Sequence, residues 1–163
     1  MAQKEAKIWE YGDFQTPRDL ATMAVTSLRE RLSFCPRTII EPTCGVGGFL
    51  VAAADAFPTA EKVIGLDVEA AYLDALKREV TARSYADKVE LICGDFFKTD
   101  WSSLLKEVPK PILVIGNPPW VTSADIGTLK GKNLPQKSNF QQHRGFDAVT
   151  GKSNFDISEW MLI

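Results

Sequence analysis

The sequence predicts an α/β protein with a Rossmann-like, doubly wound and mostly parallel sheet covered by helices on both faces. Two observations favour this class: four short apolar segments alternate with amphipathic helical segments, and each apolar segment ends in a polar or glycine-rich signature. Continuously apolar strands are typical of parallel sheets that are buried on both faces. Ligands bind such sheets beyond the carboxyl ends of the strands, so we expect a site at that edge.

The first predicted helix begins at Thr16-Pro17. Thr16 is expected to be its N-cap and Pro17 its first helical residue, with Asp19 completing a partial capping box. Apolar residues then recur at helical spacing to about Leu32. Three further helices are predicted over residues 49–57, 69–84 and 101–108.

Four buried strands are predicted before, between and after these later helices. They cover residues 38–40, 62–68, 89–93 and 111–115, and none of them alternates apolar with polar residues. The signatures at their ends are Glu41-Pro42, Asp67, Gly94-Asp95 and Gly116-Asn117. The alternation of strands with helices predicts one parallel sheet with helices on both faces.

Composition indicates one cytoplasmic domain, over residues 1–163, with an N-terminal segment at 1–16. Nineteen basic and 21 acidic side chains give a net charge of −2, which excludes a histone-like polycation. Three cysteines without metal-ligand spacing indicate a reducing compartment and no metal site. No segment reaches the roughly 18 apolar residues that span a membrane. A polar loop is predicted at residues 121–154, with five basic side chains against two acidic ones.

A glycine-rich loop, Cys44-Gly45-Val46-Gly47-Gly48, lies between the first strand and the next helix. Glycines there allow a ligand to approach the backbone closely, although a tight connection would need them too. Asp67 follows Gly47 by twenty residues, at a place where a carboxylate can accept hydrogen bonds from ribose hydroxyls. The third glycine of the dinucleotide pattern is missing. An adenosine ligand without pyrophosphate therefore fits better than NAD, and a dehydrogenase stays the minor alternative.

Asp95 is the third polar group at the same edge. Its carboxylate can accept from an adenine amine, with Phe96 or Phe97 against the ring. Taken singly, Asp67 or Asp95 could be a turn or N-cap acid. Three signatures on consecutive strands favour a shared site.

The tetrapeptide Asn117-Pro118-Pro119-Trp120 is the most specific signal in the chain. Two prolines give a rigid corner that cannot continue a strand. The Asn117 side-chain oxygen and the Pro118 carbonyl can accept both N–H bonds of an exocyclic amine and orient its lone pair toward an electrophile. Trp120 offers a face for stacking a planar group, worth roughly 1–3 kcal/mol per base in nucleic-acid systems.

These motifs resemble class I S-adenosylmethionine-dependent methyltransferases, and in particular the N6-adenine DNA methyltransferases of restriction–modification systems. The resemblance implies that the glycine loop binds the methionine part of the cofactor, that Asp67 holds its ribose, and that Asp95 and Phe96 meet its adenine. Phe14-Gln15-Thr16-Pro17 is similar to the family's N-terminal cofactor motif. The implied cofactor residues are Phe14, Thr16, Pro17, Glu41, Pro42, Cys44, Gly45, Gly47, Asp67, Val68, Asp95, Phe96 and Asn117, and the implied catalytic residues are Asn117, Pro118, Pro119 and Trp120.

The resemblance implies methyl transfer to the N6 amine of an adenine flipped out of duplex DNA. Nucleic-acid contacts are expected from the polar loop, through Lys130, Lys132, Lys137 and Arg144. The family's last three strands and its target-recognition domain have no counterpart in the 163 residues, so we expect an N-terminal catalytic part that needs another segment or subunit. The alternatives are methylation of an RNA base or a glutamine amide, or a non-catalytic fragment that binds cofactor or DNA.

Overall fold

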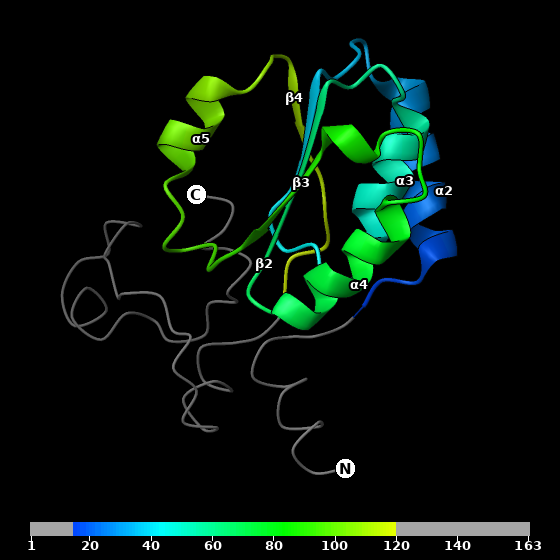
Figure 1. Ribbon diagram of the computed structural model, residues 1–163. Helices are drawn as coiled ribbons and strands as arrows, with labels where there is room; N and C mark the ends of the chain where they lie inside the picture. The colour runs from blue at the N-terminus through cyan, green and yellow to red at the C-terminus, as the bar shows by residue number, and fades with distance from the viewer. Residues whose placement is uncertain (1–14, 120–163) are drawn as a thin grey trace, which may run out of the picture. The chain divides into compact units, whose positions relative to one another are not determined.

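A four-stranded parallel sheet with helices on both faces forms the centre of the fold (Figure 1). The computed structural model describes residues 15–119. The strands are β1 (Thr38–Glu41), β2 (Lys62–Asp67), β3 (Val89–Cys93) and β4 (Ile112–Val114). The helices are α2 (Arg18–Arg31), α3 (Gly48–Ala56), α4 (Ala70–Val80), a short 3-10 helix (Ala86–Lys88) and α5 (Trp101–Glu107). The predicted fold class is confirmed.

The strand order is β3-β2-β1-β4, and every neighbouring pair is parallel. Thr38 at the start of β1 pairs with Lys62 on one side and with Ile112 on the other. The chain therefore moves outward from β1 through β2 to β3, and then crosses back to place β4 on the opposite flank of β1. This reversal makes the carboxyl ends of β1 and β4 a topological switch point, the usual ligand position in open α/β sheets.

Each face of the sheet is covered by its own helices. Ile39 packs into the larger core, with α2, α3 and α4, whereas Ile40 packs into the smaller core beneath α5. Successive strand residues point to opposite faces, so both isoleucines are buried although they are neighbours. Burying one such side chain fully is worth about 1.5–3 kcal/mol. Burial on both faces is the physical reason why the strands read as uninterrupted apolar segments.

Two helix boundaries differ from the sequence prediction. Thr16 is not the N-cap of α2, because Pro17 holds that position without a side-chain cap and the helix begins at Arg18. The Thr16 hydroxyl instead accepts a hydrogen bond from Asn117. The helix predicted over 69–84 ends at Val80, where the chain leaves the helix through Thr81. The remaining boundaries agree within one or two residues, the usual scatter at element ends.

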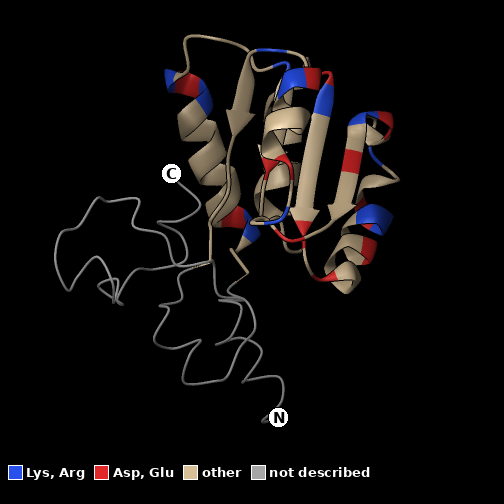
Figure 2. Ribbon diagram, turned by 90° about the vertical axis from the view of Figure 1, so that its left-hand side faces the viewer, with Lys and Arg blue, Asp and Glu red and all other residues tan. Residues whose placement is uncertain are grey.

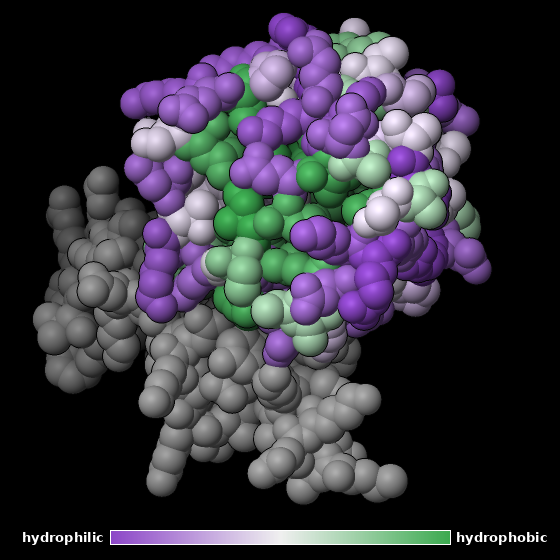
Figure 3. Space-filling view, in the orientation of Figure 1, coloured by the Kyte–Doolittle hydropathy of each residue, from purple (hydrophilic) through white to green (hydrophobic). Residues whose placement is uncertain are grey.

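The surface of the described residues carries both apolar and hydrophilic areas. In Figure 3 an apolar area runs along β3, between α5 and α4, and hydrophilic residues surround it. It corresponds to an edge strand whose Val89, Leu91 and Ile92 are only partly buried. Within residues 15–119 the structure holds no helix with the length and apolar character needed to cross a membrane.

Candidate functional site

The loop from β1 to α3 is a tight turn that requires glycine. Gly45 and Gly47 have φ angles of +50° and +83°, in the left-handed region that side chains other than glycine rarely adopt. A Cβ on Gly47 would lie 2.3 Å from Leu76 Cδ1 of α4. The loop is also tied to the sheet, because the Cys44 N–H donates to the Leu66 carbonyl at 2.9 Å. The glycine loop is therefore a rigid element at the end of β1.

Asp67, the last residue of β2, holds this loop from the side. Its Oδ2 accepts from the Gly45 N–H at 2.7 Å, and its Oδ1 accepts from the Glu69 N–H at 2.9 Å. Both carboxylate oxygens therefore fix backbone groups, one in the glycine loop and one at the start of α4. Asp67 is half-buried, and it combines a structural role in the loop with the chemistry needed to accept from a diol.

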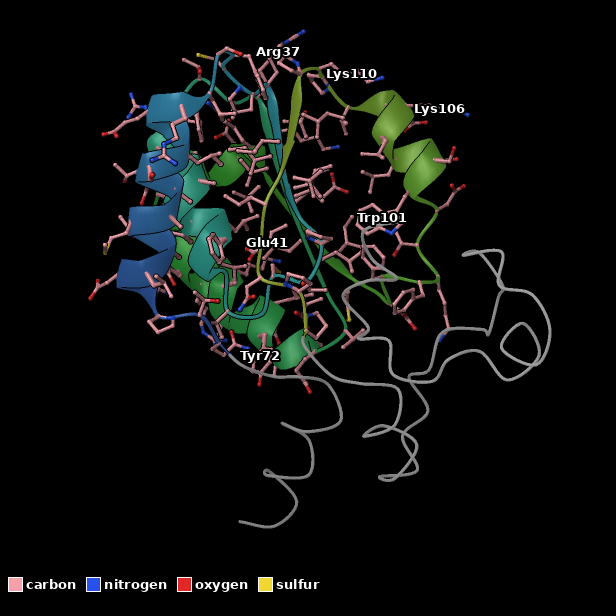
Figure 4. The ribbon with its side chains drawn as sticks, turned by 180° about the vertical axis from the view of Figure 1, so that it is seen from behind. Arg37, Glu41, Tyr72, Trp101, Lys106 and Lys110 are labelled. Carbon is pink, nitrogen blue, oxygen red and sulfur yellow. The ribbon has the colours of Figure 1, made fainter. Side chains whose placement is uncertain are left out.

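Glu41, the last residue of β1, is a carboxyl group inside the fold (Figure 4). The residue is only 3% exposed, and its Oε2 accepts from the Leu50 N–H in the first turn of α3 at 2.7 Å. Burial raises the pKa of Glu41 well above its ordinary value; the Leu50 hydrogen bond opposes the rise, and the nearby charge of Asp67 adds to it. Glu41 thus joins the end of β1 to the start of α3 in a dry environment.

Three backbone N–H groups of the glycine loop already have acceptors within the protein. They belong to Gly45, Val46 and Gly47, and their acceptors are Asp67 Oδ2, Gln15 Oε1 and the Cys44 carbonyl. A phosphate-binding loop needs such groups free, because they are what the anion contacts. Burial raises the pKa of the Cys44 thiol, and the charges of Glu41 and Asp67 add to the rise. A further negative charge beside Cys44 is therefore disfavoured. The N–H groups of Gly45, Val46 and Gly47 are therefore not available to a pyrophosphate.

The Asp95-Phe96 pair follows β3 and is fixed by its own contacts. Asp95 Oδ1 accepts from the Phe97 N–H at 2.9 Å, and Lys98 Nζ lies 3.0 Å from Oδ2. The Phe96 ring packs against Trp101, with centroids 5.1 Å apart, and the Trp101 indole N–H donates to the Phe96 carbonyl at 2.8 Å. An acid and an aromatic ring therefore stand together at the end of a third strand.

Asn117 follows β4 and reaches the segment before α2. Its Nδ2 donates to Thr16 Oγ1 at 3.3 Å, although the two residues are 101 positions apart in the chain. On the other side, Gly116 lies close to the Glu41 side chain, since a Cβ there would be 3.3 Å from Glu41 Cγ. The switch point between β1 and β4 is thus lined by Glu41, Gly116 and Asn117. Figure 2 shows acidic residues at this carboxyl edge of the sheet.

Many of the residues that the sequence singles out belong to one compact unit of the chain. Those with described positions within the compact unit 15–117 are Thr16, Pro17, Glu41, Pro42, Cys44, Gly45, Gly47, Asp67, Val68, Asp95, Phe96 and Asn117. Of these, Val68 is 46% exposed and makes no described contact with the loop. Pro118 and Pro119 belong to the chain's other unit. Phe14, Trp120, Lys130, Lys132, Lys137 and Arg144 lie outside the described residues.

Two residues of the site were missed by sequence reasoning. Gln15 contacts the glycine loop through Val46, and Gly116 allows Glu41 to approach the end of β4. Gln15 stands inside the Phe14-Pro17 motif, which was the available signal, whereas Gly116 read only as the end of a strand. Among residues 15–119 no group of three or more His, Cys, Asp or Glu side chains has metal-binding geometry.

Comparison with known proteins gives similarity to methyltransferases, both from a family model and from individual relatives. The family described as N-6 DNA Methylase matches residues 1–163. The chain is 50% identical over 154 residues to the Type II methyltransferase M.NspV of Nostoc sp., covering 94% of this chain and 32% of that protein. It is 32% identical over 122 residues to the Type II methyltransferase M.XamI of Xanthomonas campestris pv. amaranthicola, covering 71% of this chain and 21% of that protein. The chain therefore spans about a third of the first relative's length and less of the second's.

A solved structure shares the fold. It is a protein of Pyrococcus horikoshii described as a candidate RNA methyltransferase, with a TM-score of 0.54 and 18% identity. The match covers 72% of this chain and 53% of that one. At this identity the likeness concerns the fold alone.

Proposed function

Because this chain belongs to the N-6 DNA methylase family, we propose that the protein transfers a methyl group from S-adenosylmethionine to the N6 amine of adenine in DNA, within a restriction–modification system. The observation that carries the proposal is the arrangement at the switch point. There Asn117 lies at the end of β4, across from a glycine loop that Asp67 and Glu41 hold in place. The residues 1–163 form the catalytic part in this proposal.

The chemistry of the loop fits S-adenosylmethionine better than a dinucleotide. This cofactor has no phosphate, and when bound it supplies an electrophilic methyl group on a positively charged sulfur. The N–H groups of Gly45, Val46 and Gly47 are engaged, and carboxyl groups lie beside the loop. These features disfavour an anion such as pyrophosphate but are compatible with a positively charged ligand that has no phosphate. In our proposal the glycine loop holds the methionine part, Asp67 accepts from the ribose hydroxyls, and Asp95 and Phe96 contact the adenine. Thr16, Pro17, Glu41, Pro42, Cys44, Val68 and Asn117, together with Phe14, complete the proposed cofactor set.

Asn117 and the Pro118 carbonyl orient the target amine. An amine conjugated to an aromatic ring is a poor nucleophile, so its lone pair must be directed and its N–H bonds must be held. The Asn117 Nδ2 donates to Thr16, and in that amide orientation Oδ1 is the atom suited to accept from the target. Pro118 and Pro119 stiffen the corner, and Trp120 stacks against the base. The contribution of these residues is mainly positioning, and the proton released from the amine passes to water.

DNA is the proposed partner. An adenine inside a duplex must be flipped out to reach Asn117, at a cost of a few kcal/mol. Residues 121–154 carry a net charge of +3, and Lys130, Lys132, Lys137 and Arg144 are the proposed phosphate contacts. Sequence recognition is assigned to a further domain or a partner subunit. The compartment we propose is the cytoplasm, where cofactor and DNA meet.

The experiment is product analysis with the full-length protein. The protein is incubated with tritiated-methyl S-adenosylmethionine and, separately, duplex DNA, RNA or a glutamine-containing peptide, and the products are digested and separated. We expect label in DNA as N6-methyladenine. Label found only in RNA or only in glutamine would contradict DNA as the substrate and would identify that acceptor instead. Cofactor binding without transfer to any acceptor would point to a non-catalytic binding protein.

A further inference from the structure

The segment just before α2 is attached to the site at three points. Gln15 Oε1 accepts from the Val46 N–H of the glycine loop at 3.2 Å. The Thr16 carbonyl lies so close to the start of α3 that a Cβ on Gly48 would be 3.3 Å away. The Thr16 hydroxyl accepts from Asn117. Residues 15 and 16 therefore contact both the glycine loop and the residue proposed to hold the target amine.

No strand pairing and no side-chain cap secures this segment. Pro17 has no N–H group, and the N-cap position of α2 lacks a side-chain hydrogen bond. The next residue, Arg18, supplies a two-point attachment. Its two terminal nitrogens donate to both carboxylate oxygens of Glu79 on α4. The fork-shaped guanidinium matches a carboxylate in a way that a lysine does not.

This ion pair belongs to a chain of charges across three helices. Glu79 also contacts Arg83, whose Nη1 lies 2.9 Å from Asp55 on α3. The Arg18 hydrogen bond lowers the pKa of Glu79, as expected of a carboxylate held by a cation. The start of α2 and the helix α4 lie side by side in Figure 1, as the pair requires. Arg18 thus joins the Gln15–Pro17 segment to the helix that follows Asp67.

We propose that Arg18 is a positioning residue for the site: held by Glu79, it keeps Gln15 against the glycine loop and Thr16 against Asn117. The inference rests on the proposed function for its consequence in methyl transfer, and on the contacts alone for its structural part. This positioning role accounts for an arginine directly after Thr16-Pro17, at an exposed position where an unpaired charge would add little to the stability of the fold.

The chain offers a matched control. Arg37 and Glu61 form a second two-point pair, with Nε to Oε1 at 2.5 Å and Nη2 to Oε2 at 2.9 Å. Both side chains are about half exposed. Arg37 stands just before β1 and Glu61 just before β2, at the amino edge of the sheet, away from Glu41 (Figure 4). Replacing Arg37 therefore removes an ion pair of the same kind as Arg18–Glu79, but one that does not contact the site.

The test compares Arg18→Gln, Glu79→Gln, their double variant and Arg37→Gln in the full-length protein. The first readout is hydrogen exchange of the Val46 amide without cofactor. We expect faster exchange in both single variants, no additional effect in the double variant, and none in Arg37→Gln. The second readout is S-adenosylmethionine affinity by calorimetry, which we expect to fall up to about fivefold, the range of exposed ion pairs. Arg18→Lys, which keeps the charge but loses the fork, should recover part of both effects.

The two readouts separate the inference from the proposed function. If Val46 exchange in Arg18→Gln and Glu79→Gln equals that in Arg37→Gln, the positioning role is overturned, even if the wild type methylates DNA. If the wild type binds no S-adenosylmethionine, the proposed function fails, and Val46 exchange still decides whether Arg18 positions the segment. Equal losses of thermal stability in all variants, with Val46 unaffected, would mean that the pair is only structural.

Discussion

Glu41 Oε2 lies 2.7 Å from the backbone nitrogen of Leu50, so that a buried carboxyl group caps the first turn of the helix that begins seven residues after it. The contact closes the glycine loop, because it joins the strand before the loop to the helix after it. It also places the carboxyl group beside Gly116, one residue before Asn117. Much of the geometry at the switch point therefore depends on one side chain.

We predict that Glu41→Ala lowers the free energy of unfolding by about 1–3 kcal/mol or more, because it leaves the buried Leu50 N–H without an acceptor. Glu41→Gln is the matched control, since its side-chain oxygen can still accept. Urea unfolding of both variants measures the difference. Equal loss in the two variants would show that the hydrogen bond to Leu50 is not what stabilises the loop.

The same carboxyl group predicts a pH dependence. Burial raises the pKa of Glu41 in the folded protein, so as the pH rises above about 4.5 the group ionises first in the unfolded chain. The stability that it contributes is therefore complete below its unfolded pKa and is lost as the pH rises through its folded pKa. We expect the free energy of unfolding of the wild type, relative to Glu41→Gln, to fall as the pH rises above about 4.5. A difference that is constant or rises over this range would contradict the raised pKa.

Gly47 provides a test of the loop's backbone. Gly47→Ala puts a Cβ 2.3 Å from Leu76 Cδ1 at a φ of +83°, so we expect a loss of roughly 1–3 kcal/mol from strain and overpacking. Gly94→Ala is the control, because its Cβ would meet neighbours at ordinary distances of 3.7 Å or more. Thermal unfolding compares them. Similar midpoints for the two variants would mean that the loop adapts easily.

Asp67 separates the two cofactor classes. We predict that the full-length wild type binds S-adenosylmethionine and not NAD, and that Asp67→Ala loses the binding, because the variant lacks both the proposed ribose acceptor and the bond to Gly45. Asp67→Asn keeps one acceptor oxygen and should retain part of the affinity. Calorimetric titration of the wild type and of each variant with each ligand measures these affinities. Binding of NAD, or unchanged affinity in Asp67→Ala, would contradict the assignment.

The order of strands and helices could be predicted from the sequence, since apolar segments of strand length and helical periodicity are local signals. The strand ends were predicted nearly to the residue, because Glu41 and Asp67 interrupt apolar segments abruptly. The partner of Thr16 could not be found in this way. A threonine before a proline has the local pattern of a helix cap, whereas its actual partner, Asn117, is 101 residues away.

The roles of Gln15 and Gly116 escaped prediction for a related reason. Neither residue type is unusual at its position, and each acquires a role only when the fold brings it to Val46 or Glu41. Glu41 was included through a resemblance to known motifs, but its burial and its bond to Leu50 depend on how α3 returns to the sheet. Tertiary contacts of this kind leave no periodic trace in the sequence.

The measurement that tests the central claim most directly compares methyl transfer with cofactor binding in Asn117→Ala. The full-length wild type and the variant are assayed for tritiated methyl transfer to DNA, and each is titrated with S-adenosylmethionine. We predict that transfer is abolished, while cofactor affinity changes little, because Asn117 acts mainly on the target amine. Wild-type levels of N6-methyladenine formation by the variant would contradict the assignment of the catalytic corner.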